Sequence, residues 1–271
     1  MHYLPLLLLL PVVWFSFRYA WWARPVSYCR PRILMYHMIS EPLAGARFNG
    51  LRVAPAMFDR QLGWLSANGW TFMTLGELVN CIHVPERTVV ITFDDGFADN
   101  CTNALPILKK YSAKATLFLV EERHANDWST KKKAHHDSGE LAREPKLDDR
   151  QVHEMLDSGL VELGAHTFSH ANLQTLEQAE REREVVHIRQ HLEQRFGTPV
   201  SSFAYPFGIY EQTDVQLVRS AGYSAAVTTE AGIDADYRAR LLELKRIKIS
   251  GKDNFLAFRL RIRRGRRGWL K

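Results

Sequence analysis

The chain has only three cysteines among its 271 residues, Cys29, Cys81 and Cys101, and no CxxC pair. An odd number of widely spaced cysteines argues against a disulfide framework and against a thiolate metal site. The sequence also lacks internal repeats and long low-complexity tracts. With 46% hydrophobic and 24% charged residues, the composition is that of one folded globular domain with short flanks.

Acidic residues are missing from both ends of the chain. Residues 1–32 carry four arginines and residues 255–271 carry seven basic residues, and neither segment has an aspartate or a glutamate. Taking these charges of +4 and +7 from the total of +6 leaves −5 for residues 33–254. A nucleic-acid enzyme places basic surface around its active site, so this distribution argues against a nucleic-acid partner. Basic ends beside apolar and aromatic residues indicate a membrane surface instead.

The N-terminal segment, residues 1–31, is predicted to be a membrane anchor with a basic flank. Residues 3–17 are almost wholly apolar, and Trp21 and Trp22 follow where an interfacial belt would lie. The stretch reaches the roughly 20 residues that span a bilayer only if Arg18 extends toward the headgroups. A helix lying in the interface is the alternative. A cleaved signal peptide is disfavoured because no cationic region precedes the leucines.

Charge around this anchor predicts its orientation. Arginines follow the apolar stretch and none precede it, so the positive-inside rule places the catalytic body on the cytoplasmic side of a bacterial inner membrane. Residues 255–271 alternate apolar and basic residues and are predicted to be an amphipathic tail suited to anionic headgroups. A solvated basic tail is the alternative, and a nucleic-acid-binding tail is a weaker one.

Short apolar runs alternate with helical stretches between these ends. Strands are expected at residues 32–37, 88–93, 115–120, 160–166, 201–206, 223–228 and 244–249. Helices are expected at residues 55–68, 74–82, 99–112, 147–158, 175–196 and 211–221. Alternation of this kind requires crossover connections and predicts a parallel α/β barrel, complete or incomplete, within residues 32–254. Residues 121–147 are polar and without clear period, and they are a candidate substrate loop.

Reactive side chains stand at the ends of several predicted strands. His37 ends the first strand, Asp94 and Asp95 follow the second, and His166 ends the fourth. These groups are expected to converge, because parallel barrels carry their reactive groups at the carboxyl ends of the strands. Adjacent aspartates after a buried strand are costly unless a metal dication uses their charge. His166 and His170, four residues apart, are expected to lie on one side of a helical turn and face one ion.

The motifs TFDDG (residues 92–96) and HTFSH (residues 166–170) resemble those of the NodB-type polysaccharide deacetylases, carbohydrate esterase family 4. The resemblance covers roughly residues 32–250 and implies a deformed (β/α)7 barrel as a single catalytic domain. It implies Asp94 as the general base, with Asp95, His166 and His170 as ligands of a divalent metal. Zinc is the first expectation for this metal, with cobalt, nickel or iron as alternatives.

The third family motif, Arg-x-Pro-Tyr, is only partly present in FAYPFG (residues 203–208), where Ala204 replaces the arginine and Phe207 the tyrosine. The resemblance implies that the backbone amide of Phe207 stabilises the tetrahedral intermediate and that Tyr205 and Pro206 contact the substrate. Arg246, in the last predicted strand, is the candidate to orient the base in place of the missing arginine. A surface arginine is the alternative. Thr167 and Ser169 are expected to support the histidine loop.

The family's late motifs, an Asp/Trp pair and a Leu-x-His with the general acid, are not recognisable in residues 223–250. Another group must then protonate the leaving amine. His37 is the candidate, because it ends the first strand on the catalytic face and imidazole titrates in the right range. A structural histidine packed under the metal site is the alternative. His135 and His136 in the long loop are weaker candidates for an acid or an extra ligand.

The resemblance implies a hydrolase that removes N-acetyl groups from amino sugars of a cell-envelope glycan or glycolipid, in the style of the branch acting on poly-N-acetylglucosamine or lipid-linked sugars. A lipid-linked sugar fits a cytoplasmic body, and a polymeric surface glycan fits an exported one. An O-acetyl esterase and a non-catalytic glycan-binding relative stay open. A non-haem iron oxygenase also uses two histidines and a carboxylate, but it usually has antiparallel double sheets.

Overall fold

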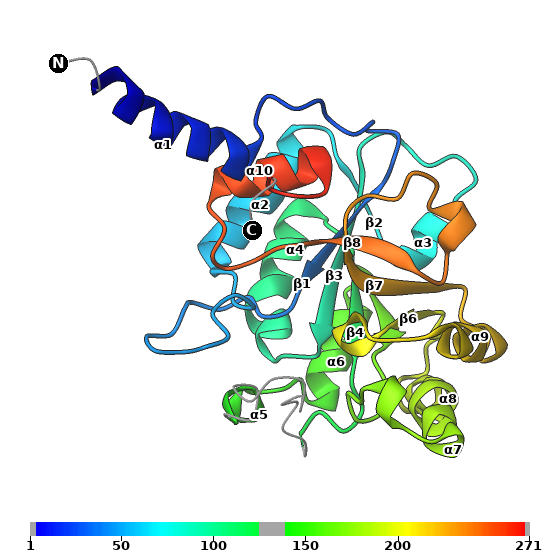
Figure 1. Ribbon diagram of the computed structural model, residues 1–271. Coiled ribbons are helices and arrows are strands. Elements are labelled where there is room, and N and C mark those ends of the chain that lie inside the picture. Colours follow the sequence, from blue (N-terminus) through cyan, green and yellow to red (C-terminus); the bar gives the residue numbers. More distant parts are fainter. Residues whose placement is uncertain (1–3, 125–138, 269–271) are drawn as a thin grey trace.

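The computed structural model describes residues 4–124 and 139–268, which form an α/β barrel (Figure 1). The strands are β1 (Arg32–Tyr36), β2 (Thr71–Met73), β3 (Thr88–Asp95), β4 (Ala115–Leu119), β5 (Val161–Ala165), β6 (Ser202–Ala204), β7 (Ala225–Ala231) and β8 (Leu244–Lys248). They pair in parallel in the order β1-β8-β7-β6-β5-β4-β3-β2, and β1 also pairs with β3. The β1–β3 pairing closes seven strands into a barrel and leaves β2 outside it. The predicted seven-stranded parallel barrel is therefore confirmed.

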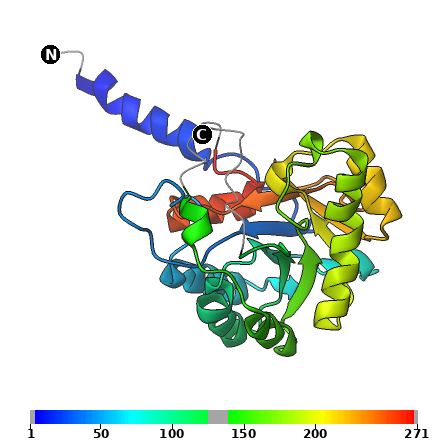
Figure 2. The same ribbon diagram turned by 90° about the horizontal axis from the view of Figure 1, so that it is seen from below.

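Helices connect the strands and cover the outside of the barrel (Figure 1, Figure 2). They are α2 (Pro55–Ala67), α3 (Leu75–Asn80), α4 (Leu105–Tyr111), α6 (Asp149–Asp157), α8 (Ile188–Phe196), α9 (Gln212–Ser220) and α10 (Phe255–Arg264). Short helices α5 (Glu140–Arg143) and α7 (Gln178–Glu182) lie in connections, and π-helical turns at Asn100–Ala104 and Arg183–His187 lead into α4 and α8. The helices predicted from periodicity are confirmed, with small shifts at their ends.

The strand β2 was not predicted from the sequence. It has only three residues, and none of them is fully buried. It pairs with the beginning of β3, with Thr71 opposite Thr88. A strand that is short and half exposed has no continuous apolar run, so hydrophobic patterning could not reveal it.

The barrel interior is filled by side chains from facing strands. A buried cluster joins Ile33 of β1, Val90 of β3, Phe118 of β4 and Leu244 of β8. Gly164 of β5 leaves space for this filling, because a Cβ at that position would lie 2.6 Å from the ring of Phe118. Side chains alternate along a strand. Thr92 and Asp94, two and four positions after Val90, and Arg246, two positions after Leu244, therefore also point into the barrel. These residues begin the candidate site.

The two ends of the chain lie together outside the barrel. Helix α1 (Leu4–Tyr19) projects away from the body, and α10 packs near its last turn (Figure 1). The residues of α10 that face the body, Ala257, Phe258, Leu260 and Ile262, are buried. The segment predicted as a tail thus begins as a packed helix. Within residues 4–124 and 139–268, no helix is both long enough and apolar enough to cross a membrane.

Candidate active site

Asp94 lies at the carboxyl end of β3, inside the barrel and against Arg246 of β8. Arg246 donates two hydrogen bonds to the two carboxylate oxygens of Asp94, over 2.6 and 2.8 Å. It also donates to the hydroxyl of Thr92 at 3.0 Å and to the carbonyl oxygen of Thr228 at 2.8 Å. The structure therefore places the predicted Arg246 beside the predicted base, in the barrel interior and not on the surface.

The environment of Asp94 keeps its carboxylate charged. Burial alone raises the pKa of this group, but the charge and hydrogen bonds of Arg246 outweigh burial and hold the pKa below its ordinary value. Because both carboxylate oxygens accept from one planar guanidinium, the orientation of the group is also fixed. An ionised and oriented carboxylate is what a general base requires.

Asp95, His166 and His170 form a buried group next to Asp94. The Oδ1 atom of Asp95 lies 3.3 Å from Nε2 of His166 and 3.4 Å from Nε2 of His170. Donor atoms held at about 2.0–2.2 Å from a tetrahedral ion lie roughly 3.3 Å apart, so the spacing and the donor types fit a divalent metal. Nδ1 of His166 lies 2.8 Å from the carbonyl oxygen of Ala204, which fixes the ring with Nε2 toward Asp95. This group could bind a metal ion.

Asp95 departs from the side-chain alternation of its strand. Its φ of 80° is left-handed, so its carboxylate lines the same pocket as that of Asp94. Burial raises the pKa of Asp95, but hydrogen bonds with His166 and His170 hold it well below its ordinary value. Left-handed backbone at a non-glycine residue is strained and is concentrated at functional sites. Thr167, His170 and Phe207 adopt it here as well, with φ of 63°, 58° and 59°.

The histidine loop is not a helical turn, so that sequence prediction was wrong. Residues 166–170 follow β5 without helical structure, and the left-handed residues Thr167 and His170 reverse the chain so that both imidazoles reach Asp95. The prediction failed because it took the four-residue spacing as evidence of a helix, whereas a turn also brings such residues together.

Hydroxyl groups hold this loop, as predicted. The hydroxyl of Thr167 accepts from the backbone N–H of Ala171 at 3.2 Å. The backbone N–H and hydroxyl of Ser169 both donate to the carboxylate of Glu184, over 2.9 and 2.8 Å. Glu184 is buried and comes from the π-helical turn before α8, so a residue remote from both motifs fixes the loop.

The turn after β6 carries Phe207 to the pocket. Phe207 has φ of 59° and ψ of −2°, and its ring packs edge-on against His170 with centroids 4.5 Å apart. Gly208 has φ of +66°, and a Cβ there would lie 2.0 Å from Oγ1 of Thr229. Only glycine therefore fits directly after Phe207.

Tyr205 and Pro206, which were predicted to contact the substrate, are both buried. Tyr205 lines the pocket, but it is fully buried and its hydroxyl donates to the carbonyl oxygen of Leu242 at 3.1 Å. Pro206 is buried as well. Their predicted contact with substrate stays a prediction.

His37 follows β1 and lines the same pocket. Its carbonyl oxygen accepts from the side-chain amide of Asn100 at 2.8 Å, which fixes the backbone where the strand ends. Burial lowers the pKa of His37, and the charges of Asp95 and Asp94 oppose this shift. The side chain thus lies where the sequence placed it, on the catalytic face.

These groups border one cavity of about 420 Å³ at the carboxyl ends of the strands. Its lining comprises Met35, His37, Phe48, Leu51, Asp94, Asp95, Leu141, His166, His170, Tyr205, Phe207, Thr229 and Lys248. One side is formed by Asp95, His166 and His170, and another by apolar side chains of two loops. Lys248 was missed from the sequence, although it lies two residues after Arg246 on the same face of β8 and alternation could have found it.

The two rim loops are joined beside the cavity. Arg52 is buried and donates to both carboxylate oxygens of Glu144, over 3.0 and 2.6 Å. Backbone N–H groups of Arg47 and Phe48 donate to the carboxylate of Glu140 at 2.9 and 3.2 Å. The loop after β1 and the region around α5 therefore contact each other and together line one side of the cavity.

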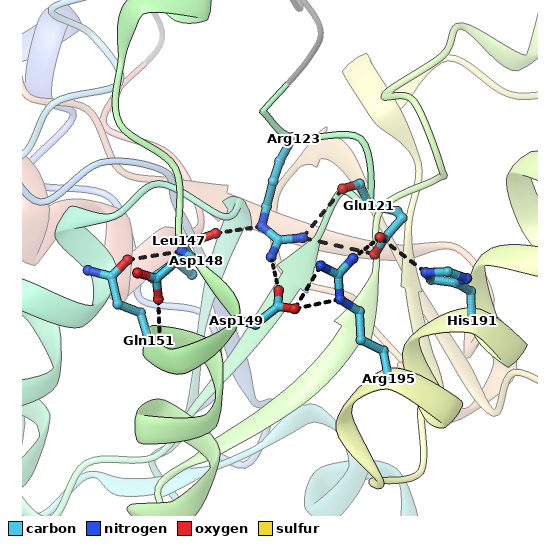
Figure 3. Close-up of polar contacts among 8 residues, drawn as sticks. All are labelled: Glu121, Arg123, Leu147, Asp148, Asp149, Gln151, His191 and Arg195. Carbon is cyan, nitrogen blue, oxygen red and sulfur yellow. Dashed lines mark hydrogen bonds and ion pairs between the residues drawn. The ribbon is translucent and has the colours of Figure 1, made fainter.

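Ion pairs also join the two ends of the candidate substrate loop (Figure 3). Arg123, directly after β4, donates to the carbonyl oxygen of Leu147 at 2.6 Å and to Asp149 of α6 at 2.8 Å. Arg195 of α8 contacts Asp149 as well, at 2.7 Å, and pairs with Glu121. Both ends of the loop are thereby fixed to the barrel. His135 and His136 lie outside the described residues.

A closed parallel barrel with a held carboxylate beside an Asp-His-His group, all at the carboxyl ends of its strands, defines a hydrolase of the α/β barrel class. The family model for polysaccharide deacetylase matches residues 82–226, which include both sequence motifs. The chain belongs to the polysaccharide deacetylase family and is a carbohydrate deacetylase. The matched residues contain Asp94 and the Asp95-His166-His170 group but neither His37 nor Arg246.

Individual relatives agree with this assignment. YxkH of Bacillus subtilis, named for the same family, is 30% identical over 84% of this chain and 75% of its own length. The poly-β-1,6-N-acetyl-D-glucosamine N-deacetylase of Staphylococcus aureus is 27% identical over 66% of this chain and 61% of its own length. The Streptococcus pyogenes deacetylase PplD, solved in complex with acetate, superposes with a TM-score of 0.68 at 29% identity, covering 84% of this chain and 94% of PplD.

Proposed function

We propose that the protein is a metal-dependent N-deacetylase that removes acetyl groups from amino sugars of a cell-envelope glycan or lipid-linked sugar. The observation that carries the proposal is the pairing of Asp94 with Arg246 directly beside the Asp95-His166-His170 group in one cavity. The family assignment supports the reaction, and the named activity of the Staphylococcus aureus relative supports an N-acetylated substrate.

In this proposal Asp94 accepts a proton from the attacking water, and Arg246 keeps its carboxylate ionised and oriented. Asp95, His166 and His170 would hold the metal. When bound, a divalent ion would supply Lewis-acid chemistry, polarising the amide carbonyl and lowering the pKa of water. We expect zinc first, with cobalt, nickel or iron as alternatives. Phe207 is proposed to direct its backbone amide at the developing oxyanion.

His37 is proposed as the general acid for the leaving amine. It lines the cavity on the side of β1, across from the FAYPFG turn. Burial lowers the pKa of His37, but the charges of Asp95 and Asp94 oppose this shift and favour the protonated imidazole that a general acid needs. Tyr205 and Pro206 would shape the floor beneath the sugar.

The proposed substrate depends on which side of the membrane the catalytic body faces. A body facing the cytoplasm at a bacterial inner membrane, held by residues 1–31, would act on a lipid-linked N-acetylhexosamine. An exported body would act on a polymeric surface glycan. Reporter fusions at the C-terminus separate the two, since a signal confined to the periplasm contradicts the cytoplasmic proposal.

Acetate release tests the reaction. Purified protein supplied with zinc, cobalt or nickel is expected to release acetate from N-acetylglucosamine oligomers, and Asp94→Asn is expected to abolish release. The matched control is Asp157→Asn, at the far end of α6. Release that survives Asp94→Asn would contradict the assignment of the base. Faster release of acetate from O-acetylated than from N-acetylated sugar would show that the protein acts as an esterase and not as an amidase.

A further inference from the structure

The two ends of the chain are joined into one unit. The guanidinium of Arg263 in α10 donates to the carbonyl oxygen of Trp21 at 2.7 Å, and the backbone N–H of Val26 donates to the carbonyl oxygen of Arg263 at 3.0 Å. Arg264 donates to the carbonyl oxygen of Ala20 at 3.4 Å. Figure 1 shows α10 beside the end of α1. The two segments that lack acidic residues are therefore neighbours in space.

Arg32 fixes this unit to the barrel. It is fully buried at the start of β1, and it donates to the carbonyl oxygens of Ile262 at 2.9 Å, Val26 at 2.8 Å and Ser27 at 2.8 Å. Its guanidinium also lies 5.2 Å from the ring centroid of Tyr28. One side chain thus binds the segment after α1 and the last turn of α10 at once, so their juxtaposition is part of the folded core.

Large apolar side chains project from this unit into solvent. The exposed fractions are 55% for Trp14, 52% for Phe17, 54% for Trp21 and 56% for Trp22. Single exposed apolar residues are ordinary, but several large ones on one segment mark an interaction surface. Tryptophan in particular favours the boundary between lipid headgroups and hydrocarbon.

Cations belong to the same terminal unit as these aromatic residues. Leu256, Arg259 and Arg263 are spaced so that they share one face of α10, opposite the buried face that contains Phe258. Arg18 lies over the ring of Trp14, and Arg24 is exposed. No acidic residue occurs in residues 1–32 or 255–271. Aromatic side chains surrounded by arginines complement an anionic bilayer, where each basic residue contributes about 1 kcal/mol.

We propose that the end of α1 and the exposed face of α10 form one surface that binds anionic bilayers. This terminal surface consists of Trp14, Phe17 and Arg18 of α1, the exposed Trp21, Trp22 and Arg24 that follow α1, Leu256, Arg259 and Arg263 of α10, and the exposed Arg266 that follows α10. It differs from a simple N-terminal anchor because α10, from the other end of the chain, contributes binding. Its binding to lipid does not depend on the reaction proposed above.

The terminal surface runs along α10, whose first residue follows the carboxyl end of β8 and whose last turn lies at the start of β1. Helix α10 begins seven residues after Lys248, which lines the cavity, so the connection spans at most about 25 Å. In both ribbon views α1 projects from the side of the molecule that carries the loop after β1 (Figure 1, Figure 2). That loop supplies Phe48 and Leu51 to the cavity.

Vesicle cosedimentation of the full chain tests the surface. Vesicles of phosphatidylcholine alone are compared with vesicles that also contain phosphatidylglycerol. Arg24→Gln/Arg259→Gln/Arg266→Gln is expected to weaken binding to the anionic vesicles on the order of a hundredfold. The control Lys109→Gln/Arg150→Gln/Arg219→Gln removes the same charge from other exposed positions and is expected to change binding by less than about twofold. Equal losses in both variants, or no loss in the first, would overturn the proposal.

Two further measurements separate the terminal surface from an anchor made by α1 alone. Trp21→Ser/Trp22→Ser is expected to weaken binding to both kinds of vesicle, and unchanged binding would contradict the proposal. In a chain with serine at its three cysteine positions, a fluorophore at Arg259→Cys is expected to be quenched by spin-labelled lipid, whereas one at Arg150→Cys is not. An unquenched label at position 259 would show that α10 does not contact lipid. Far-ultraviolet circular dichroism verifies that each variant is folded.

Discussion

Arg246 and Asp94 share two hydrogen bonds of 2.6 and 2.8 Å across the barrel, although 152 positions separate them in the chain. The family places an orienting arginine in its third motif, where this chain has Ala204. Here the same guanidinium function comes from β8. In the proposed mechanism the base is therefore oriented by a residue on another strand.

Arg246→Lys is expected to lower kcat on the order of a hundredfold, because a single ammonium cannot bind both oxygens of Asp94. Losing the guanidinium also raises the pKa of Asp94, so the base stays protonated to higher pH. The acidic limb of the pH–rate profile should move to higher pH, which a purely structural effect would not cause. Steady-state kinetics across pH measure both effects, and Arg219→Gln on α9 serves as the control.

Glu184→Gln is expected to weaken zinc binding by about 10-fold to 100-fold, because Glu184 holds the histidine loop through Ser169. Isothermal titration of the metal-free protein with zinc measures the change. Glu182→Gln is the matched control, since it lies two residues away and is exposed. Equal affinities for the two variants would show that the loop does not need this support.

Gly208→Ala is expected to be far more destabilising than Gly197→Ala. Both glycines have left-handed backbone, with φ of +66° and +64°, but only at Gly208 would a Cβ meet other atoms, 2.0 Å from Oγ1 of Thr229. We expect a loss of about 1 kcal/mol at Gly197 from backbone conformation alone and about 1–3 kcal/mol more at Gly208 from overpacking. Denaturant unfolding gives the free energy of unfolding of both variants. Similar losses of stability in the two variants would contradict the predicted clash between a Cβ at position 208 and Thr229.

Asp99→Asn is expected to reduce the dependence of stability on pH. Burial raises the pKa of Asp99 to about 6, although hydrogen bonds with Ile39 and Ser40 lower it in part. The folded state therefore prefers the protonated acid, and this stabilising contribution is complete below about pH 4 and is lost as the pH rises through about 6. The free energy of unfolding of the variant should gain roughly 2 kcal/mol relative to the parent between about pH 4 and pH 6. A constant difference between the two proteins would contradict the prediction.

The sequence predicted the barrel because its strands are buried on both faces and appear as apolar runs, as in RILMYH and TVVITF. It predicted the positions of Asp94, His37 and Arg246 because strand ends converge in such a fold. The conformation of the histidine loop could not be predicted, since Thr167 adopts left-handed backbone that β-branched residues rarely adopt.

Other contacts escaped prediction because they depend on residues that no motif marks. Glu184 and Thr228 act through hydrogen bonds that join different elements of the fold. The joining of the two basic ends depends on Arg32, whose partners are backbone carbonyl groups that every residue possesses. Sequence patterns identify reactive side chains better than they identify the neighbours that hold them.

The ion pairs among Arg123, Asp149 and Arg195 have a consequence for how this protein could diversify (Figure 3). They bring the beginning and the end of residues 121–147 together without using the residues between. Loop-closure entropy rises only slowly with length, so insertions and deletions between residues 124 and 139, outside the contacts of Glu140 and Glu144, should leave the barrel intact. The sequence and length of this segment could therefore change during evolution while the catalytic residues stay in place, and such changes could alter which sugar the enzyme prefers.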